Sequence, residues 1–147
     1  MLADLAEERA VRADGRLRAN TIIWLTTVTP DGQPQTSPVG YTWDGHTFLI
    51  ISAPAAPKVR NLRGNPRVAL HLDLDTADEE HSVLTIEGIA ELDQAPPGGP
   101  APLTGDEVAA YLEKHREAMD GAGMTPEEAF TELSTVIRVR PTRARSY

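Results

Sequence analysis

The segment with the clearest chemical potential is residues 52–66, where a lysine lies in the first turn of a short predicted helix. Helix starts carry free N–H groups and a partial positive charge, so Lys58 is mildly unfavourable there unless an anion joins it. Lysine and free N–H groups together make a natural phosphate site, to which Arg60, the Asn61 amide and the Ser52 hydroxyl could contribute. A solvated basic turn that packs only through its apolar side chains explains the spacing equally well.

Proline and glycine set the limits of this helix. Pro57 suits the first helical position, because its missing N–H would have no intrahelical partner there. Gly64 suits the position just past the end, and Pro66 prevents continuation. The apolar runs 48–51 and 67–72 on either side are typical of strands. The sequence therefore predicts a strand–helix–strand unit around Lys58.

The rest of the chain is rich in strand signals. β-branched residues, apolar alternation and Asp-Gly turns predict six strands, at residues 21–29, 35–43, 46–52, 67–75, 83–93 and 135–140. Leu74 is expected on the inner face of the fourth strand. Pro38 indicates an edge or a bulge, because proline cannot donate to a ladder, and Gly88 indicates a bulge or a close approach of another backbone. The third strand is apolar on both faces, so it needs a second layer from a barrel wall or another subunit.

Helices are predicted around the strands. One spans residues 2–18, with an interruption at Asp14-Gly15, and another spans 104–119, with Thr104 as N-cap and Glu107 as its capping-box partner. A short helix begins near residue 126, and residues 141–147 form a tail. The fold class is mostly β with flanking helices: one domain, residues 1–147, built on a six-stranded antiparallel barrel closed to remove exposed edges.

Composition excludes several classes of function. The formal net charge is -8, from 14 basic and 22 acidic side chains, whereas a nucleic-acid-binding surface is net basic. Cysteine is absent, which excludes disulfides, zinc fingers and thiol nucleophiles. No apolar run approaches the length of a membrane span, and residues 1–20 are too charged for a signal peptide. We expect a cytoplasmic protein without nucleic-acid or membrane partners.

The sequence offers one weak metal candidate. His71, Asp73 and Asp75 share one face of a predicted strand, but no second ligand cluster with metal spacing accompanies them. Solvent or a subunit contact is therefore the expected environment of this face, and no metal site is predicted. The acids of residues 73–80 are expected in a solvated loop. The other histidines are scattered and expected at the surface: His46, His81 and His115.

The sequence resembles the pyridoxamine 5'-phosphate oxidase-like superfamily of FMN-binding split β-barrels. Within it, the chain is most similar to the actinobacterial group that uses the deazaflavin coenzyme F420. The resemblance rests on segments spread over most of the chain: 24–28 (WLTTV), 31–35 (DGQPQ), 38–39 (PV), 43–45 (WDG), 58–68 (KVRNLRGNPRV), 87–88 (EG) and 137–141 (IRVRP).

The resemblance implies a six-stranded antiparallel split β-barrel that forms a homodimer, with two cofactor sites at the interface and a small-molecule substrate. On matching positions, Lys58 and Asn61 hold the cofactor phosphate, with Ser52 nearby. Many relatives have a further basic or hydroxyl residue before this lysine, where residues 55–57 here are Ala, Ala and Pro. That departure either weakens the phosphate site or shifts the duty to Arg60 or Arg63. The residues implied to run beside the cofactor ring are Thr36, Ser37, Pro38 and Val39.

The implied activity is hydride transfer from reduced F420 to an unsaturated small-molecule acceptor. The cofactor performs that chemistry while the protein binds and orients it, so no catalytic residue is assigned. Ser37 either hydrogen-bonds the ring edge or is a turn-side hydroxyl. An FMN-dependent oxidase or reductase and a non-catalytic flavin or deazaflavin carrier are alternatives. Both cofactors present a phosphate, and the acidic tail of F420 needs a basic groove that this acidic chain supplies only locally.

Overall fold

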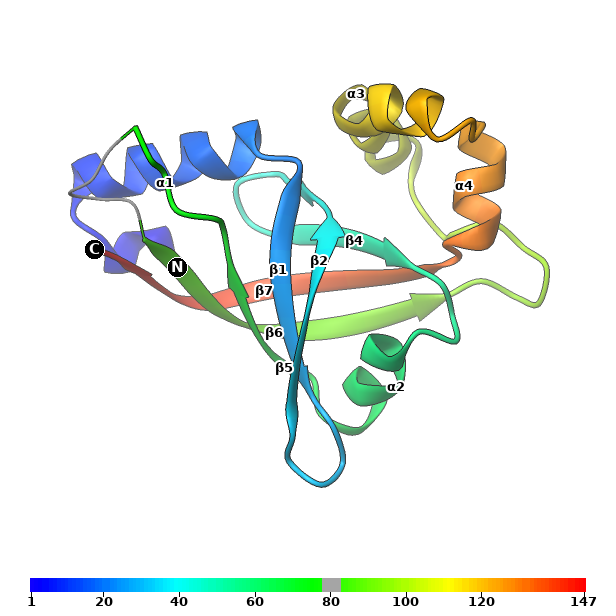
Figure 1. Cartoon of the computed structure of the whole chain (residues 1–147), viewed down its shortest axis with the longest axis horizontal. Coiled ribbons are helices and arrows are strands. Elements are labelled where there is room, and N and C mark those ends of the chain that lie inside the picture. The colour runs from blue at the N-terminus through cyan, green and yellow to red at the C-terminus, as the bar shows by residue number, and fades with distance from the viewer. Residues whose placement is uncertain (78–82) are drawn as a thin grey trace.

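The computed structural model describes residues 1–77 and 83–147, which form one curved antiparallel sheet with flanking helices (Figure 1). The strand order is β2-β1-β5-β6-β7-β4-β3. The strands are β1 Ile22–Val28, β2 Pro34–Gly40, β3 Thr42–Trp43, β4 Phe48–Ser52, β5 Arg67–His71, β6 Leu84–Gln94 and β7 Thr135–Ser146. The helices are the 3₁₀ helix η1 Leu2–Asp4, α1 Glu7–Ala19, α2 Pro57–Gly64, α3 Gly105–Gly121 and α4 Pro126–Glu132. His81 and much of the expected acidic loop lie outside the described residues.

The β1–β2 hairpin forms where the Asp-Gly signal predicts it. Gly32 has φ +92°, a left-handed conformation that glycine adopts without steric cost. Thr29 closes the turn, because its hydroxyl accepts a hydrogen bond from the Gln33 N–H at 3.0 Å. β2 is an edge strand, as Pro38 predicts. The hairpin extends as a long arm beside α2 (Figure 1).

The sheet has seven strands, so the prediction of six strands was wrong. The expected strand 35–43 is broken at Tyr41 into β2, which pairs with β1, and β3, which pairs with β4. At the break, the buried Tyr41 carbonyl accepts a hydrogen bond from His115 Nε2 at 2.7 Å instead of bonding within a ladder. The sheet curls into a split barrel whose two edge strands, β2 and β3, meet at Tyr41 and remain edges.

His115 is buried, so its expected surface position was wrong. The Tyr111 ring packs on the imidazole at a centroid distance of 4.4 Å, and both residues belong to α3. A Cβ on Gly40 would lie 3.3 Å from atoms of both rings, so glycine allows α3 to approach β2 closely. Burial lowers the pKa of the His115 imidazole, although its bond to the Tyr41 carbonyl opposes this effect. Nε2 is the donor in this bond, because a carbonyl oxygen can only accept.

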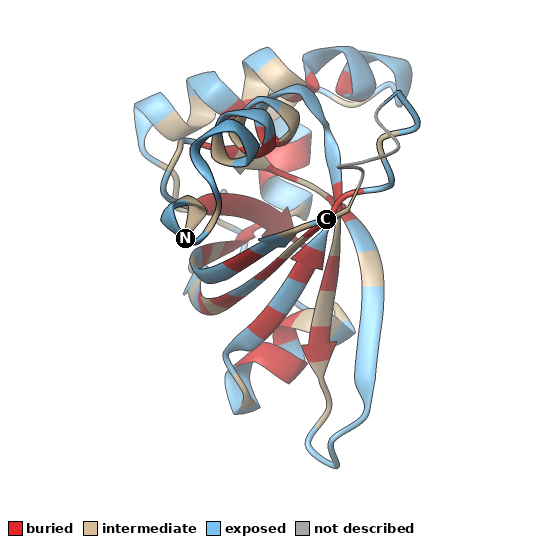
Figure 2. Ribbon diagram, turned by 90° about the vertical axis from the view of Figure 1, so that its left-hand side faces the viewer, coloured by how far each residue is buried: buried red, intermediate tan, exposed pale blue. Residues whose placement is uncertain are grey.

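β4 is buried along its whole length, as its apolar composition predicts (Figure 2). Phe48 and Ile50 belong to the barrel core. Leu49 and Ile51 belong to a second core, which includes apolar side chains of α3 and α4. The barrel thus covers one face of β4, as expected. Helices of the same chain cover the other face, where the sequence suggested another subunit as one possibility.

β7 continues to Ser146, so the expected tail at residues 141–147 is mostly strand. Its pairing with β6 shifts between Glu87 and Gly88, which places Gly88 opposite Pro141. A Cβ on Gly88 would lie 2.7 Å from the Val139 side chain and 3.0 Å from the Arg140 carbonyl oxygen. Both the predicted bulge and the predicted close approach at Gly88 are confirmed.

Two element boundaries differ from the predictions. α1 runs without interruption through Gly15, where the neighbouring Asp14 carboxylate accepts hydrogen bonds from Arg18 Nε at 2.8 Å and Trp43 Nε1 at 2.9 Å. β5 ends at His71, and Leu74 is 64% exposed instead of facing the core. No helix in residues 1–77 or 83–147 combines the length and apolar character needed to cross a membrane.

Candidate functional site

An open cavity of about 430 Å³ lies between the edge strand β2 and the start of α2. Three of the predicted site residues meet there: Thr36, Ser37 and Lys58. Its remaining lining residues are Thr27, Gln35 and Pro57. The volume falls in the range of small-molecule sites, so the structure brings the predicted lysine and two predicted hydroxyls to one recess.

The start of α2 leaves donor groups free toward this recess. Ala56 is the N-cap and makes no side-chain cap, and Pro57 has no N–H. The N–H groups of Val59 and Arg60, which follow Lys58, bond to the Ala56 carbonyl. Within the described residues, neither the Lys58 ammonium nor its backbone N–H has a partner. An ammonium and a free N–H at a helix start favour an anionic ligand.

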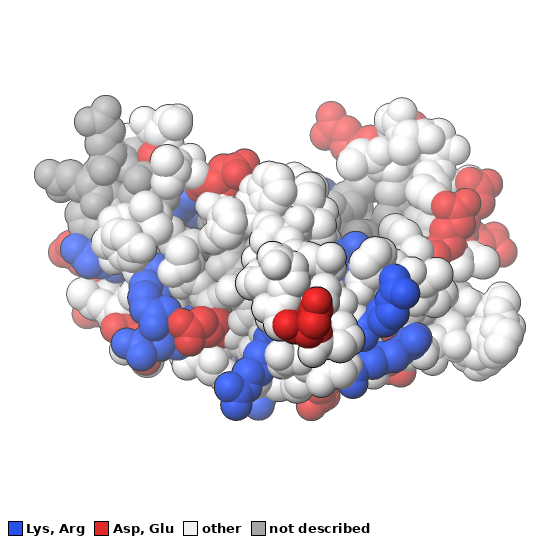
Figure 3. Space-filling model, turned by 60° about the horizontal axis from the view of Figure 1, so that its bottom comes forward, with Lys and Arg blue, Asp and Glu red and all other residues white. Residues whose placement is uncertain are grey.

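The surface around α2 is basic although the chain is acidic overall. No Asp or Glu occurs between Asp44 and Asp73. Figure 3 shows basic side chains over α2, beside the tip of the β1–β2 hairpin. In the part of the chain that the structure describes, none of four cations there forms an ion pair: Lys58, Arg60, Arg63 and Arg67. The charge of -8 therefore coexists with a local positive surface.

Asn61 lies behind the cavity wall and is 5% exposed. Its Nδ2 donates to Thr27 Oγ1 at 3.0 Å and to Gln35 Oε1 at 2.9 Å. These bonds tie α2 to both strands of the hairpin, and they use both hydrogens of the amide. Val59 and Leu62 hold the same helix on the barrel core, as their spacing predicts.

Four other predicted residues do not line the cavity. Ser52 is buried at the end of β4, where its hydroxyl donates to the Ala53 carbonyl at 3.1 Å. Val39 belongs to the barrel core. Pro38 and Arg60 are exposed, on β2 and α2 respectively. They surround the recess without forming its wall.

The sequence did not predict Thr27, Gln35 and Pro57 as lining residues. Thr27 follows Ile23 and Leu25 at inward positions of β1, and it is 2% exposed. A polar residue at an inward position is a signal that could have identified it. Gln35 lies directly opposite Thr27 in the hairpin register, so an assigned register would have added it.

The His71–Asp73–Asp75 candidate has other contacts. The His71 ring stacks on Trp24 at a centroid distance of 6.1 Å, and Asp73 accepts a hydrogen bond from Trp24 Nε1 at 2.8 Å. Asp75 accepts one from the Ala77 N–H. Across residues 1–77 and 83–147 there is no group of three or more His, Cys, Asp or Glu side chains arranged to hold a metal.

A family model described as pyridoxamine 5'-phosphate oxidase matches residues 11–146. This chain belongs to that family. Solved structures of similar fold include an F420 reductase, with 28% sequence identity, a TM-score of 0.67, and coverage of 90% of this chain and 94% of that chain. The heme storage protein HutZ from Vibrio cholerae has 18% identity and a TM-score of 0.68, with 92% of both chains covered. Rv2991 from Mycobacterium tuberculosis has 23% identity and a TM-score of 0.68, with 99% of this chain and 87% of that chain covered.

The pyridoxamine 5'-phosphate oxidase family includes oxidoreductases and binds flavin-type cofactors. A phosphate-bearing cofactor of this type fits the donor set of the recess. The Lys58 ammonium and N–H offer hydrogens to phosphate oxygens, and the Ser37 hydroxyl lies in the same recess, whereas the Thr36 hydroxyl shares a hydrogen bond with the Thr26 hydroxyl at 2.6 Å. No carboxylate lines the cavity among the described residues. The family assignment and the geometry therefore indicate the same location.

Proposed function

We propose that this protein is an oxidoreductase that transfers hydride from reduced coenzyme F420 to an unsaturated small-molecule acceptor. The observation that carries the proposal is the recess that Lys58 lines together with Thr36 and Ser37, with no partner for Lys58 among the described residues. The 28% identity to an F420 reductase, over 90% of this chain, supports the choice of cofactor.

In this proposal Lys58 and its backbone N–H hold the cofactor phosphate by charge-assisted hydrogen bonds. Thr36 and Ser37 lie along the ring, with Pro38 and Val39 continuing the same edge strand. The bound deazaflavin supplies the hydride. The chain binds and orients it, since the cavity is lined by no carboxylate or imidazole among the described residues.

The basic surface of α2 favours F420 over FMN. F420 carries an acidic oligoglutamate tail. Arg60 and Arg63 are exposed cations one helical turn apart, and neither has an acidic partner in residues 1–77 or 83–147. FMN has no such tail and leaves both arginines without a role. We therefore propose that Arg60 and Arg63 contact the tail and that Lys58 contacts the phosphate.

A non-catalytic flavin or deazaflavin carrier is the second candidate. The observation that favours it is the cavity lining, in which Lys58 is the one titratable group among the described residues. An FMN-dependent oxidase or reductase remains the alternative within the same family. The three proposals differ in which cofactor binds and in whether turnover follows.

Titration of the purified protein with F420 and with FMN, followed by fluorescence, separates these proposals. We expect F420 to bind in the micromolar range or tighter, and the reduced cofactor to be consumed only when an enone or quinone acceptor is added. Tight FMN binding without F420 binding would overturn the F420 assignment. Binding of F420 without turnover across a broad acceptor panel would instead establish the carrier.

We also propose a homodimer with the recess at its interface. The recess opens at an unpaired sheet edge, and outward side chains of β2 and of β5, the second strand from this edge, are exposed: Thr36, Pro38, Ala69 and His71. A second copy on this face would cover them and exclude water from the recess. Light scattering after size-exclusion chromatography should give twice the mass of the chain, and a monomer at all concentrations would contradict the proposal.

A further inference from the structure

The two hydrogen bonds of Asn61 determine which atoms the cavity wall presents. Thr27 Oγ1 and Gln35 Oε1 both accept from the buried Asn61 amide. When such an oxygen accepts a hydrogen bond from inside the protein, the hydrogens of its own hydroxyl or carboxamide group stay available to a ligand. The Thr27 hydroxyl hydrogen and the Gln35 Nε2 group are then the available parts.

Gln35 is the more accessible of the two. It is exposed, it lines the cavity, and within the described chain its Nε2 has no partner. A carboxamide held at its oxygen cannot turn over without losing the bond from Asn61. Its two N–H groups therefore point away from Asn61, and Lys58, which lines the same cavity, is likewise without a partner among the described residues.

We propose that Gln35 is a ligand-binding residue, and that Asn61 is a positioning residue that makes Gln35 a donor. This inference rests on the proposed function, because it takes the occupant of the cavity to be the flavin-type cofactor. Gln35 would donate to an acceptor oxygen of that cofactor, either in the phosphate or in a ring carbonyl. With Lys58 and Thr27, the wall then presents hydrogens rather than lone pairs, and so selects an acceptor-rich, anionic ligand.

The assignment differs from the role that the family resemblance implies for Asn61. A residue that holds the phosphate needs a free amide hydrogen, and both hydrogens of Asn61 are used inside the protein. Asn61 is three residues after Lys58, on the same side of α2. It therefore sets the distance between the lysine and the hairpin while it orients Gln35.

The decisive variant is Asn61→Asp, which replaces a donor with an acceptor of nearly the same shape. The ionised carboxylate of this variant accepts but cannot donate, so the Thr27 hydroxyl can turn to donate to it, and the Gln35 carboxamide must turn its Nε2 to it and present its oxygen to the ligand. We expect cofactor affinity to fall about tenfold or more, as one donor is replaced by a repelling lone pair. Thermal unfolding confirms that the variant is folded.

A double-mutant cycle with Gln35→Ala separates the effect of the turned amide from that of the added negative charge in Asn61→Asp. If Asn61 acts through Gln35, Asn61→Asp should lower affinity much less in the Gln35→Ala background. Additive effects, with wild-type binding intact, would overturn this inference and leave the proposed function standing. Wild-type protein that binds neither F420 nor FMN would overturn the proposed function and the ligand role of Gln35 together.

A ligand-free measurement tests the orientation directly. In the ¹H–¹⁵N spectrum, the Asn61 side-chain amide should exchange slowly with solvent and the Gln35 side-chain amide quickly. The reverse pattern would mean that Gln35 is the donor to Asn61, and would overturn the inference. Gln35→Glu then locates the acceptor: an affinity loss for FMN but not for riboflavin indicates the phosphate, and an equal loss for both indicates a ring carbonyl.

Discussion

Helices α2 and α3 begin in opposite ways. α2 has no side-chain cap, no acid in its first turn, and a lysine that is unpartnered within the described residues. α3 has a complete capping box: Thr104 Oγ1 accepts from the Glu107 N–H at 3.2 Å, and Glu107 Oε1 accepts from the Thr104 N–H at 2.9 Å. The positive end of α3 is neutralised within the protein, whereas the positive end of α2 has no such neutralising group among the described residues.

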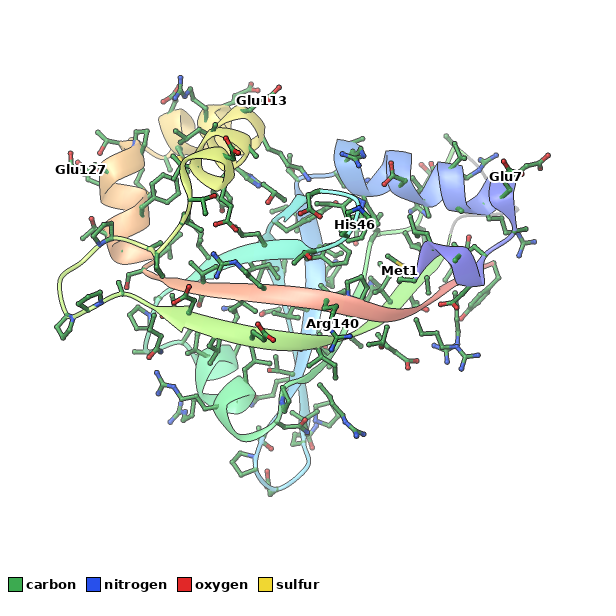
Figure 4. The ribbon with its side chains drawn as sticks, turned by 180° about the vertical axis from the view of Figure 1, so that it is seen from behind. Met1, Glu7, His46, Glu113, Glu127 and Arg140 are labelled. Carbon is green, nitrogen blue, oxygen red and sulfur yellow. The ribbon has the colours of Figure 1, made fainter. Side chains whose placement is uncertain are left out.

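The surroundings extend this contrast. Arg138 on β7 binds Glu107 at 3.0 Å and Asp93 at 3.1 Å, so α3 is joined to the sheet by ion pairs. Burial opposes ionisation of Glu107, but its bonds with Arg138 and Thr104 hold the pKa of that carboxyl below its usual value. Glu113 and Glu127 project from the outer sides of α3 and α4 (Figure 4). Acids thus stabilise the α3 side through Arg138, whereas no acid occurs in residues 45–72 around α2.

The largest expected effect is on binding at α2. Lys58→Ala should weaken F420 or FMN binding roughly ten- to a hundredfold, since a charge-assisted bond to phosphate contributes about 1.5–3 kcal/mol. The free energy of unfolding should stay unchanged, because Lys58 has no partner within the described protein. Fluorescence titration measures the affinity. Arg116→Ala on α3 removes the same charge and serves as the control. If both variants lost the same cofactor affinity, the change in net charge alone would explain the effect of Lys58→Ala.

Arg138→Met, in contrast to Lys58→Ala, should lower stability and leave cofactor binding unchanged. The two ion pairs and the bond to the Pro102 carbonyl are lost, which leaves a part-buried Glu107 carboxylate without its cation. We expect a loss of about 2 kcal/mol in the free energy of unfolding, measured by urea denaturation, with cofactor affinity retained. Arg140→Met is the control, because Arg140 is exposed and lies further along β7, away from α3 (Figure 4). If both variants lost a similar free energy of unfolding, the ion pairs of Arg138 would not be the cause.

Ala56→Asp would give α2 the kind of start that α3 has. The new carboxylate can accept from the free Lys58 N–H, so the protein should gain about 1 kcal/mol of stability. Cofactor affinity should fall on the order of tenfold, because the carboxylate occupies the anion site. Ala55→Asp adds the same charge outside the N-cap position. If Ala55→Asp lowers cofactor affinity and raises stability as much as Ala56→Asp does, capping of α2 is not the cause of these effects.

The smallest expected effect is a pH dependence on the α3 side. Burial lowers the pKa of His115 in the folded protein below the ordinary 6.5, so the unfolded chain binds the proton more readily. The contribution of His115 to stability is complete above about pH 6.5 and is lost as the pH falls below it. His115→Gln keeps a donor for the Tyr41 carbonyl without titrating. The free energy of unfolding, measured with urea above and below pH 6.5, should depend less on pH in this variant. An unchanged pH dependence would mean that a group other than His115 titrates.

The elements that local chemistry specifies could be predicted. The Asp31-Gly32 and Asp44-Gly45 turns, the limits of α2 and the Thr104–Glu107 capping box all depend on residues close together in the sequence. The same locality placed Lys58 in the first turn of α2. The positions of Thr36 and Ser37 on the strand beside Lys58, by contrast, depend on the register of the β1–β2 hairpin.

The sequence by itself determined where hairpins turn, where α2 begins, and that a lysine lies at that uncapped start, because these depend on short-range sterics and hydrogen bonding. Only the tertiary structure decided that Asn61 bonds to Thr27, 34 positions away, and that His115 bonds to Tyr41, 74 positions away. An amide or an imidazole has several possible partners, and its choice depends on which groups the folded sheet brings within about 3 Å of it.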